Sequence, residues 1–208
     1  TLEEKVQIRA ELRKELDTAE DATVALFVGS DYKRKGLMRN LEAVKALAEK
    51  GVRLELWVLG ADDPKPYEAF AQASNLPVQF LGGRADATRF FDAADFLLHP
   101  AHSESAGKVL LEALTHSLPV IVTDSCGYAK QIGDSGGGVV VASPFSQPNF
   151  NGIVAKISKD FNYRQSLSEA ALEYAEKGDI YSCSERFARQ IETVMERAEA
   201  NDSRWHEG

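Results

Sequence analysis

Cysteine, positive charge and long apolar stretches are all scarce in this chain of 208 residues. The two cysteines, Cys126 and Cys183, lie far apart, which excludes the disulfide framework of a small secreted protein and fits no zinc-site spacing. Apolar runs such as Val139 to Ala142 are far shorter than the roughly 20 residues that a membrane-spanning helix needs. The first residues also lack the apolar stretch of a signal peptide. We therefore expect a protein of the reducing cytoplasm.

Acidic residues outnumber basic ones: 32 aspartates and glutamates against 24 lysines and arginines give a net charge of −8. Such a chain repels nucleic acid unless its positive charge is concentrated in one block, and the sequence has no such block. Its length suffices to bury one core without a metal or a disulfide. We expect a single domain over residues 1–208, with no nucleic-acid partner, no metal and no resident cofactor.

Short apolar runs alternate with amphipathic segments along the chain. The runs expected to form strands are 23–28, 53–59, 78–81, 95–98, 119–122 and 139–141. The expected helices are a leading helix within 1–20, then 37–50, 67–74, 86–93 and 106–115, and a helical C-terminal segment over 149–208 with an apolar stripe of Phe187, Ile191, Val194 and Met195. Because parallel strands need crossover connections, this order predicts an α/β fold, a Rossmann-like doubly wound parallel sheet of about six strands with helices on both faces.

The loop after the strand at 95–98 carries the strongest functional signal. The small residues Ser105, Ala106 and Gly107 open the next helix, where free N–H groups and the helix dipole favour an anion such as phosphate. Glu112 lies roughly 6–9 Å further along, about the distance from a nucleotide's phosphates to its ribose. Glu104 precedes the helix and would lie beside whatever the diphosphate carries. The alternative is a surface helix with two ordinary glutamates.

A second loop, after the first strand, carries Lys33, Arg34 and Lys35 before Gly36. Arginine and lysine at the carboxyl edge of a parallel sheet are suited to clamp a diphosphate. A solvated basic turn is the alternative. The helix start at Ser105, Ala106 and Gly107, which is expected at the same sheet edge, favours the interpretation as a phosphate site. His99 and His102 lie in the loop after the fourth strand and receive no role.

These residues resemble the nucleotide-sugar-binding half of the retaining GT-B glycosyltransferases of family 4, and most closely those that add glucose to the heptose of the lipopolysaccharide core. The resemblance covers about positions 20–200. The matching runs are Val28-Gly29-Ser30-Asp31, Arg34-Lys35-Gly36, Leu97-Leu98-His99-Pro100-Ala101, Ala106-Gly107, Leu110-Leu111-Glu112-Ala113, Leu118-Pro119-Val120, Cys126-Gly127-Tyr128-Ala129 and Pro144-Phe145-Ser146-Gln147, with seven residues between Glu104 and Glu112.

The resemblance implies a role for each site residue. Arg34 and Lys35 would hold the diphosphate of a UDP-sugar in place of a metal, and Arg84 would lie near the base. Glu112 would bind the ribose hydroxyls and Glu104 the hydroxyls of the transferred hexose, which is glucose in this subgroup. The backbone N–H groups that would meet the β-phosphate and the sugar are those of Ala106, Gly107, Lys108 and Val109.

Family members have a further, N-terminal domain that supplies the acceptor site, and we expect that domain to be absent from this chain. The chain would then bind the donor without turning it over, and the lipopolysaccharide acceptor would be met through the missing domain at the inner face of the inner membrane. Ser105-Ala106 also departs from the bulky aromatic that the wider family places before the glycine. The sequence leaves open a stand-alone nucleotide-diphosphate-binding module without catalysis.

A competing motif, Gly133-Asp134-Ser135-Gly136-Gly137, matches the serine-hydrolase pattern Gly-x-Ser-x-Gly. A nucleophile elbow needs a strand before the serine and a helix after it, whereas this sequence predicts a helical turn before Ser135 and a strand after it. A glycine-rich turn that leads into a strand explains the motif, and the hydrolase is the weaker hypothesis.

Overall fold

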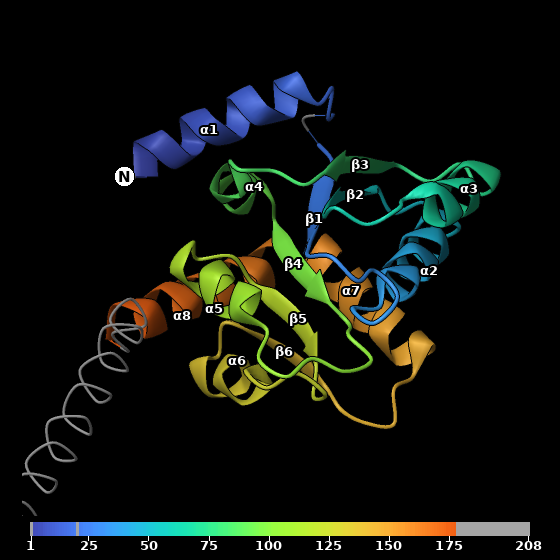
Figure 1. Cartoon of the computed structure of the whole chain (residues 1–208). Coiled ribbons are helices and arrows are strands. Elements are labelled where there is room, and N and C mark those ends of the chain that lie inside the picture. The colour runs from blue at the N-terminus through green and yellow to red at the C-terminus, as the bar shows by residue number, and fades with distance from the viewer. Residues whose placement is uncertain (1, 20, 178–208) are drawn as a thin grey trace, which may run out of the picture.

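The computed structural model describes residues 2–19 and 21–177, and these form one twisted sheet with helices packed on both of its faces (Figure 1). The strands are β1 (Thr23–Val28), β2 (Leu54–Leu59), β3 (Val78–Gly82), β4 (Phe96–His99), β5 (Val120–Thr123) and β6 (Gly138–Val141). The helices are α1 (Leu2–Glu15), α2 (Leu37–Ala48), α3 (Lys65–Ala73), α4 (Ala87–Ala93), α5 (Lys108–Thr115), α6 (Ala129–Ser135), α7 (Gln147–Lys159) and α8 (Phe161–Lys177).

The strand order is β3-β2-β1-β4-β5-β6, and every neighbouring pair is parallel. The chain first builds outward from β1 to β3 and then returns to the other side of β1 with β4. The loops that follow β1 and β4 therefore separate at a topological switch point, the place where open parallel sheets bind their ligands. The predicted doubly wound α/β sheet is confirmed.

Two apolar clusters cover the two faces of the sheet. One cluster joins β1, β4 and β5 through Leu26, Leu97 and Val120 to helices α1, α4, α5 and α6. The other joins the alternate residues of the same strands, such as Phe27 and Leu98, to α2, α3 and α7. Because the central strands are buried on both sides, their sequences are apolar without alternation, which is the pattern that predicted them.

Helix boundaries differ from the predicted ones where a loop residue adopts a special conformation. Helix α5 begins at Lys108 and not at Ala106, because Gly107 takes a left-handed conformation with φ 80° at its N-cap. The predicted C-terminal helical segment is interrupted at Asp160, whose carboxylate accepts a hydrogen bond from the Tyr163 N–H and so caps a second helix. The predicted apolar stripe over 187–195 and the second cysteine at 183 lie outside the described residues.

Asp95 is one of the residues that attach α1 to the sheet. The Asp95 carboxylate, just before β4, accepts hydrogen bonds from Arg9 at 2.8 Å, from Arg13 at 2.7 Å and from the Val24 N–H at 2.7 Å. Arg13 is only 7% exposed, and burial lowers its pKa although Asp95 favours its charge. This carboxylate therefore neutralises a buried cation and fixes the helix that precedes the first strand.

Candidate functional site

The carboxyl ends of β1, β4 and β5 bring the loops 29–36, 100–107 and 124–128 together. The His102 N–H donates to the Arg34 carbonyl at 2.7 Å, which joins the first loop to the second. Glu104 forms a parallel bridge with Cys126, and the Gly127 N–H donates to the Glu104 carbonyl at 3.0 Å. Backbone hydrogen bonds therefore fix the position of Glu104 from both sides.

The Glu104 side chain lies between two cations that come from the loop after β1. Its Oε2 atom lies 3.2 Å from Arg34 Nη1 and 3.7 Å from Lys35 Nζ. The glutamate side chain is 11% exposed and the lysine side chain 18%, whereas that of Arg34 is 41% exposed. The structure thus brings together Arg34, Lys35 and Glu104, although Lys35 and Glu104 are 69 positions apart in the chain.

Opposing effects act on the ionisation of Glu104. Burial raises the pKa of its carboxyl group, but Lys35, Arg34 and hydrogen bonds from Arg34 and the Ala106 N–H lower it further than burial raises it. The net shift is downward, so the carboxylate is ionised at neutral pH. Lys35 and Arg34 thus place two positive charges beside this carboxylate, and Arg34 is also paired with the Asp31 carboxylate.

Two glycines permit the close approach of these loops. A side chain at Gly29, which has φ 135°, would place its Cβ 2.3 Å from Lys35 Nζ, so the ammonium group lies directly against the glycine backbone. A Cβ at Gly127 would lie 2.1 Å from the Ser105 carbonyl oxygen, which is rigid backbone. A larger residue at Gly29 would displace the Lys35 side chain, and one at Gly127 would displace the backbone next to Glu104.

The start of α5 lies beside Glu104. A Cβ built on the left-handed Gly107 would lie 3.4 Å from Glu104 Cγ, and the N–H groups of Lys108 and Val109 belong to the first helical turn, which has no intrahelical acceptors for them. Glu112 stands one turn beyond Lys108, is exposed, and forms no side-chain hydrogen bond or ion pair with a described residue. Its carboxylate is available to a ligand that extends along the helix.

Arg84 lies apart from this cluster in the loop that follows β3. Its guanidinium donates two hydrogen bonds to Asp86, at 2.8 and 2.9 Å, and lies 5.3 Å from the centre of the Phe90 ring. These hydrogen bonds raise the pKa of Arg84 and lower that of Asp86 to about 2. The arginine is therefore fixed at the sheet edge by its own loop, and no contact joins it to Glu104.

Asp31 is a site residue that the sequence patterns did not single out. Its carboxylate accepts a hydrogen bond from Arg34 Nε at 2.6 Å and another from the Arg34 N–H at 3.2 Å. Arg34 Nη1 also donates to the Ser103 carbonyl at 2.9 Å. The three-residue spacing between Asp31 and Arg34 within a turn was the available signal for this contact.

The two histidines of the loop after β4 have different environments. His99 is fully buried, whereas His102 is exposed. Burial, Arg39 and Lys33 lower the pKa of His102, so its ring is neutral at pH 7. Neither ring forms a hydrogen bond with a described residue.

Ser135 of the hydrolase motif is engaged by the backbone. It is the last residue of α6, it donates to the Ile132 carbonyl at 2.8 Å, and it accepts from the Gly137 N–H at 2.9 Å. A helix precedes this serine and a strand follows it, which is the reverse of a nucleophile elbow. The hydroxyl therefore serves as part of a helix end.

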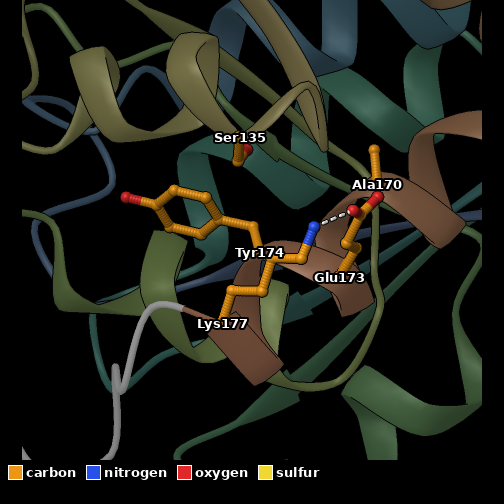
Figure 2. A pocket seen from close by; sticks show the side chains of 5 residues that line it. All are labelled: Ser135, Ala170, Glu173, Tyr174 and Lys177. Atoms are coloured by element: carbon orange, nitrogen blue, oxygen red, sulfur yellow. Dashed lines mark hydrogen bonds and ion pairs between the residues drawn. The ribbon is translucent and has the colours of Figure 1, made fainter.

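An open pocket of about 330 Å³ lies next to this serine, between α6 and α8 (Figure 2). Its lining residues are Ser135, Ala170, Glu173, Tyr174 and Lys177. The Lys177 ammonium and the Glu173 carboxylate pair with each other, as the dashed line shows. None of the pocket's lining residues is a histidine that could serve as the base of a hydrolase.

Within the described part of the chain, no group of three or more His, Cys, Asp or Glu side chains is placed to hold a metal ion. In the same residues, no helix has the length and apolar character needed to cross a membrane.

Comparison with known proteins assigns this arrangement to a family. Residues 8–174 match the family of glycosyl transferases group 1. The chain belongs to this family. It is 42% identical over 172 residues to the lipopolysaccharide glucosyltransferase WaaG of Escherichia coli (strain K12), an alignment that covers 81% of this chain and 46% of the relative.

Solved structures agree with this assignment. The crystal structure of WaaG superposes with a TM-score of 0.83 and 41% identity, over 88% of this chain and 50% of that one. Alr3699/HepE of Anabaena, solved in complex with UDP-glucose, has the same fold at a TM-score of 0.76 and 21% identity, over 90% of this chain and 53% of that one. The chain thus spans about half the length of these group 1 relatives.

The half that it matches is the C-terminal one. The C-terminal domain of the group 1 protein LpcC from Francisella tularensis has this fold at a TM-score of 0.69 and 20% identity, and the match covers 81% of this chain and 91% of that domain. The predicted resemblance to the nucleotide-sugar-binding half of a GT-B glycosyltransferase is confirmed, and the fold of this group 1 domain is that of a C-terminal GT-B domain.

Proposed function

We propose that this chain is the donor-binding domain of a retaining glycosyltransferase that moves a hexose from a UDP-sugar to the heptose of the lipopolysaccharide inner core. The observation that carries the proposal is the position of Glu104, held between Arg34 and Lys35 beside the start of α5. The 42% identity to WaaG, whose name describes a lipopolysaccharide glucosyltransferase, supports glucose as the hexose.

The two cations of the cluster suit a departing diphosphate. When the sugar is transferred, negative charge accumulates on the leaving nucleotide, and preorganised cations stabilise that charge in place of a metal ion. Arg34 and Lys35 would meet the diphosphate, together with the N–H groups of Gly107, Lys108 and Val109 at the helix start. The Ala106 N–H, which also lowers the pKa of the Glu104 carboxyl group, would join them.

The two glutamates would then bind the two sugars of the donor. Glu104 is placed to accept hydrogen bonds from the hydroxyls of the transferred hexose, and Glu112, one turn into α5, from those of the ribose. Arg84, at the β3 end of the same sheet edge, would lie beside the base. Turnover would also need an acceptor domain, through which the lipopolysaccharide core is met.

Calorimetric titration of the chain with UDP and UDP-glucose, with and without magnesium, tests the proposal. We expect both nucleotides to bind, and their affinity to survive removal of the metal by a chelator. Absence of heat with either nucleotide would contradict a self-contained donor site. If UDP binds but an added N-terminal domain restores no transfer to heptose acceptors, the alternative of a nucleotide-binding module without catalysis is correct.

Substitution of Glu112 tests the ribose contact. Glu112→Ala is expected to weaken UDP binding by about 1.5–3 kcal/mol, because charge-assisted hydrogen bonds to the ribose hydroxyls are lost. Glu42→Ala, an exposed glutamate on α2, is the matched control and should leave the affinity unchanged. The comparison of UDP with 2′,3′-dideoxy-UDP completes the test: the variant should bind the two equally, and a remaining preference for UDP would place the ribose elsewhere.

A further inference from the structure

His99, the last residue of β4, is a buried polar side chain that the proposed donor contacts do not use. Its exposure is 0%, and neither ring nitrogen has a hydrogen-bond partner among the described residues. An imidazole with both nitrogens buried and unpaired costs free energy, so such a group in a folded protein calls for an explanation.

His99 lies on the interior side of the candidate site, between the site and the core of the protein. Side chains alternate along a strand, so His99 shares the face of Leu97, the face that α5 covers. On the neighbouring strand β1, Val28 packs on the same face and is followed by Gly29, against which the Lys35 ammonium lies. The imidazole is therefore behind the cluster as seen from solvent.

Burial and the neighbouring cations keep the His99 ring neutral. The pKa of this histidine is lowered to about 4, chiefly by burial and next by Lys35, while Glu104 opposes the shift and Arg34 adds a smaller lowering. A neutral imidazole has one nitrogen that donates a hydrogen bond and one that accepts. At pH 7 the ring therefore offers an acceptor to a neighbouring cation.

The Lys35 ammonium has no hydrogen-bond acceptor among the described residues. Its ammonium lies 3.7 Å from Glu104 Oε2, which is longer than a hydrogen bond, and it forms no hydrogen bond with any described residue. The side chain is only 18% exposed, so water reaches it from one side. An unpaired donor and an unpaired acceptor thus occupy the same region at the end of β1 and β4.

We propose that His99 is a positioning residue for Lys35: its neutral ring accepts a hydrogen bond from the ammonium, and this holds the positive charge over Gly29 when Glu104 turns to the transferred sugar. This inference rests on the proposed function, because it is the bound donor that would draw Glu104 away from Lys35. His99 itself does not touch the donor, because it has no exposed surface.

A test without nucleotide uses Glu104→Gln, which releases Lys35 from its carboxylate as the donor would. In this variant, labelled with ¹⁵N-lysine at pH 6, we expect slowly exchanging ammonium protons on Lys35, identified by the loss of their signal in Lys35→Arg. Glu104→Gln/His99→Phe should lose that signal, and Glu104→Gln/His99→Gln should keep it. An equal signal with phenylalanine would overturn the proposal, whether or not the chain binds nucleotides.

The binding test then compares UDP-glucose with uridine, which has no phosphate. His99→Phe is expected to weaken UDP-glucose binding about tenfold and to leave uridine unchanged, because Lys35 meets only the diphosphate. In a Lys35→Met background, His99→Phe should have no further effect. With Lys35 present, His99→Gln should keep most of the affinity that His99→Phe loses. If phenylalanine weakens both ligands equally, or acts equally in the Lys35→Met background, His99 has a packing role only.

Discussion

Replacement of Arg34 and Lys35 together by alanine is expected to weaken UDP binding about 100-fold or more, because charge-assisted contacts from two cations to the diphosphate are lost. The same variant should bind with a much weaker dependence on salt, since screening acts on the charges that have been removed. Isothermal titration with UDP at several salt concentrations measures both effects.

Lys33→Ala is the matched control, because Lys33 carries the same charge in the same loop, is exposed, and has no ion pair with Glu104. It should change the affinity only slightly. The double variant leaves Glu104 partly buried without a cation, so Arg34→Gln/Lys35→Gln/Glu104→Gln is the second variant, in which none of these three side chains is charged. If either variant binds UDP as tightly as the unmodified chain does, the diphosphate contacts are assigned to the wrong residues.

The proximity of Arg34, Lys35 and Glu104 was predictable because of the sheet topology. Carboxyl ends of parallel strands lie at one edge, and an apolar run before each loop identified the strands. Residues 23–28 were predicted as a strand and are β1 to the residue. The sequence therefore indicated which loops meet before any distance was available.

What the sequence did not predict depends on contacts between those loops. The bridge between Glu104 and Cys126 joins backbone segments whose approach is limited by Gly127, and no period or capping pattern encodes it. The start of α5 was expected at Ala106, among the small residues Ser105, Ala106 and Gly107, but the left-handed Gly107 delays it to Lys108. Tertiary packing and one backbone conformation decided both outcomes.

For His99 the sequence favoured a structural role over a substrate contact, but it did not show how deeply the side chain is buried. A histidine at a strand end before a proline is compatible with an exposed loop or with a core position, and the difference lies in the coverage by α5. Its neighbour in the loop, His102, has the same side chain and is exposed. Residue type does not distinguish the two histidines, whereas the position of His99 as the last residue of β4 explains its burial.

Asp95→Ala is expected to lower the free energy of unfolding by about 3–5 kcal/mol, because it leaves the buried Arg13 guanidinium without its carboxylate. It also removes the acceptor of the Val24 N–H at the start of β1 and an ion pair to Arg9. Both effects act where α1 meets the sheet, on the central strand. Urea unfolding should show a lower midpoint with an unchanged dependence on denaturant.

The control is Asp21→Ala, which removes an ion pair with Arg53 whose two side chains are 66% and 73% exposed. Exposed pairs contribute little, so its unfolding midpoint should stay near that of the unmodified chain. Asp95→Asn keeps the shape and one acceptor oxygen but loses the charge, and should fall between the two. Since Asp95 lies far from the loops that hold Glu104, any fully folded fraction of Asp95→Ala should bind UDP with unchanged affinity. Equal midpoints for the alanine variants of Asp95 and Asp21 would mean that Arg13 finds another partner when α1 shifts.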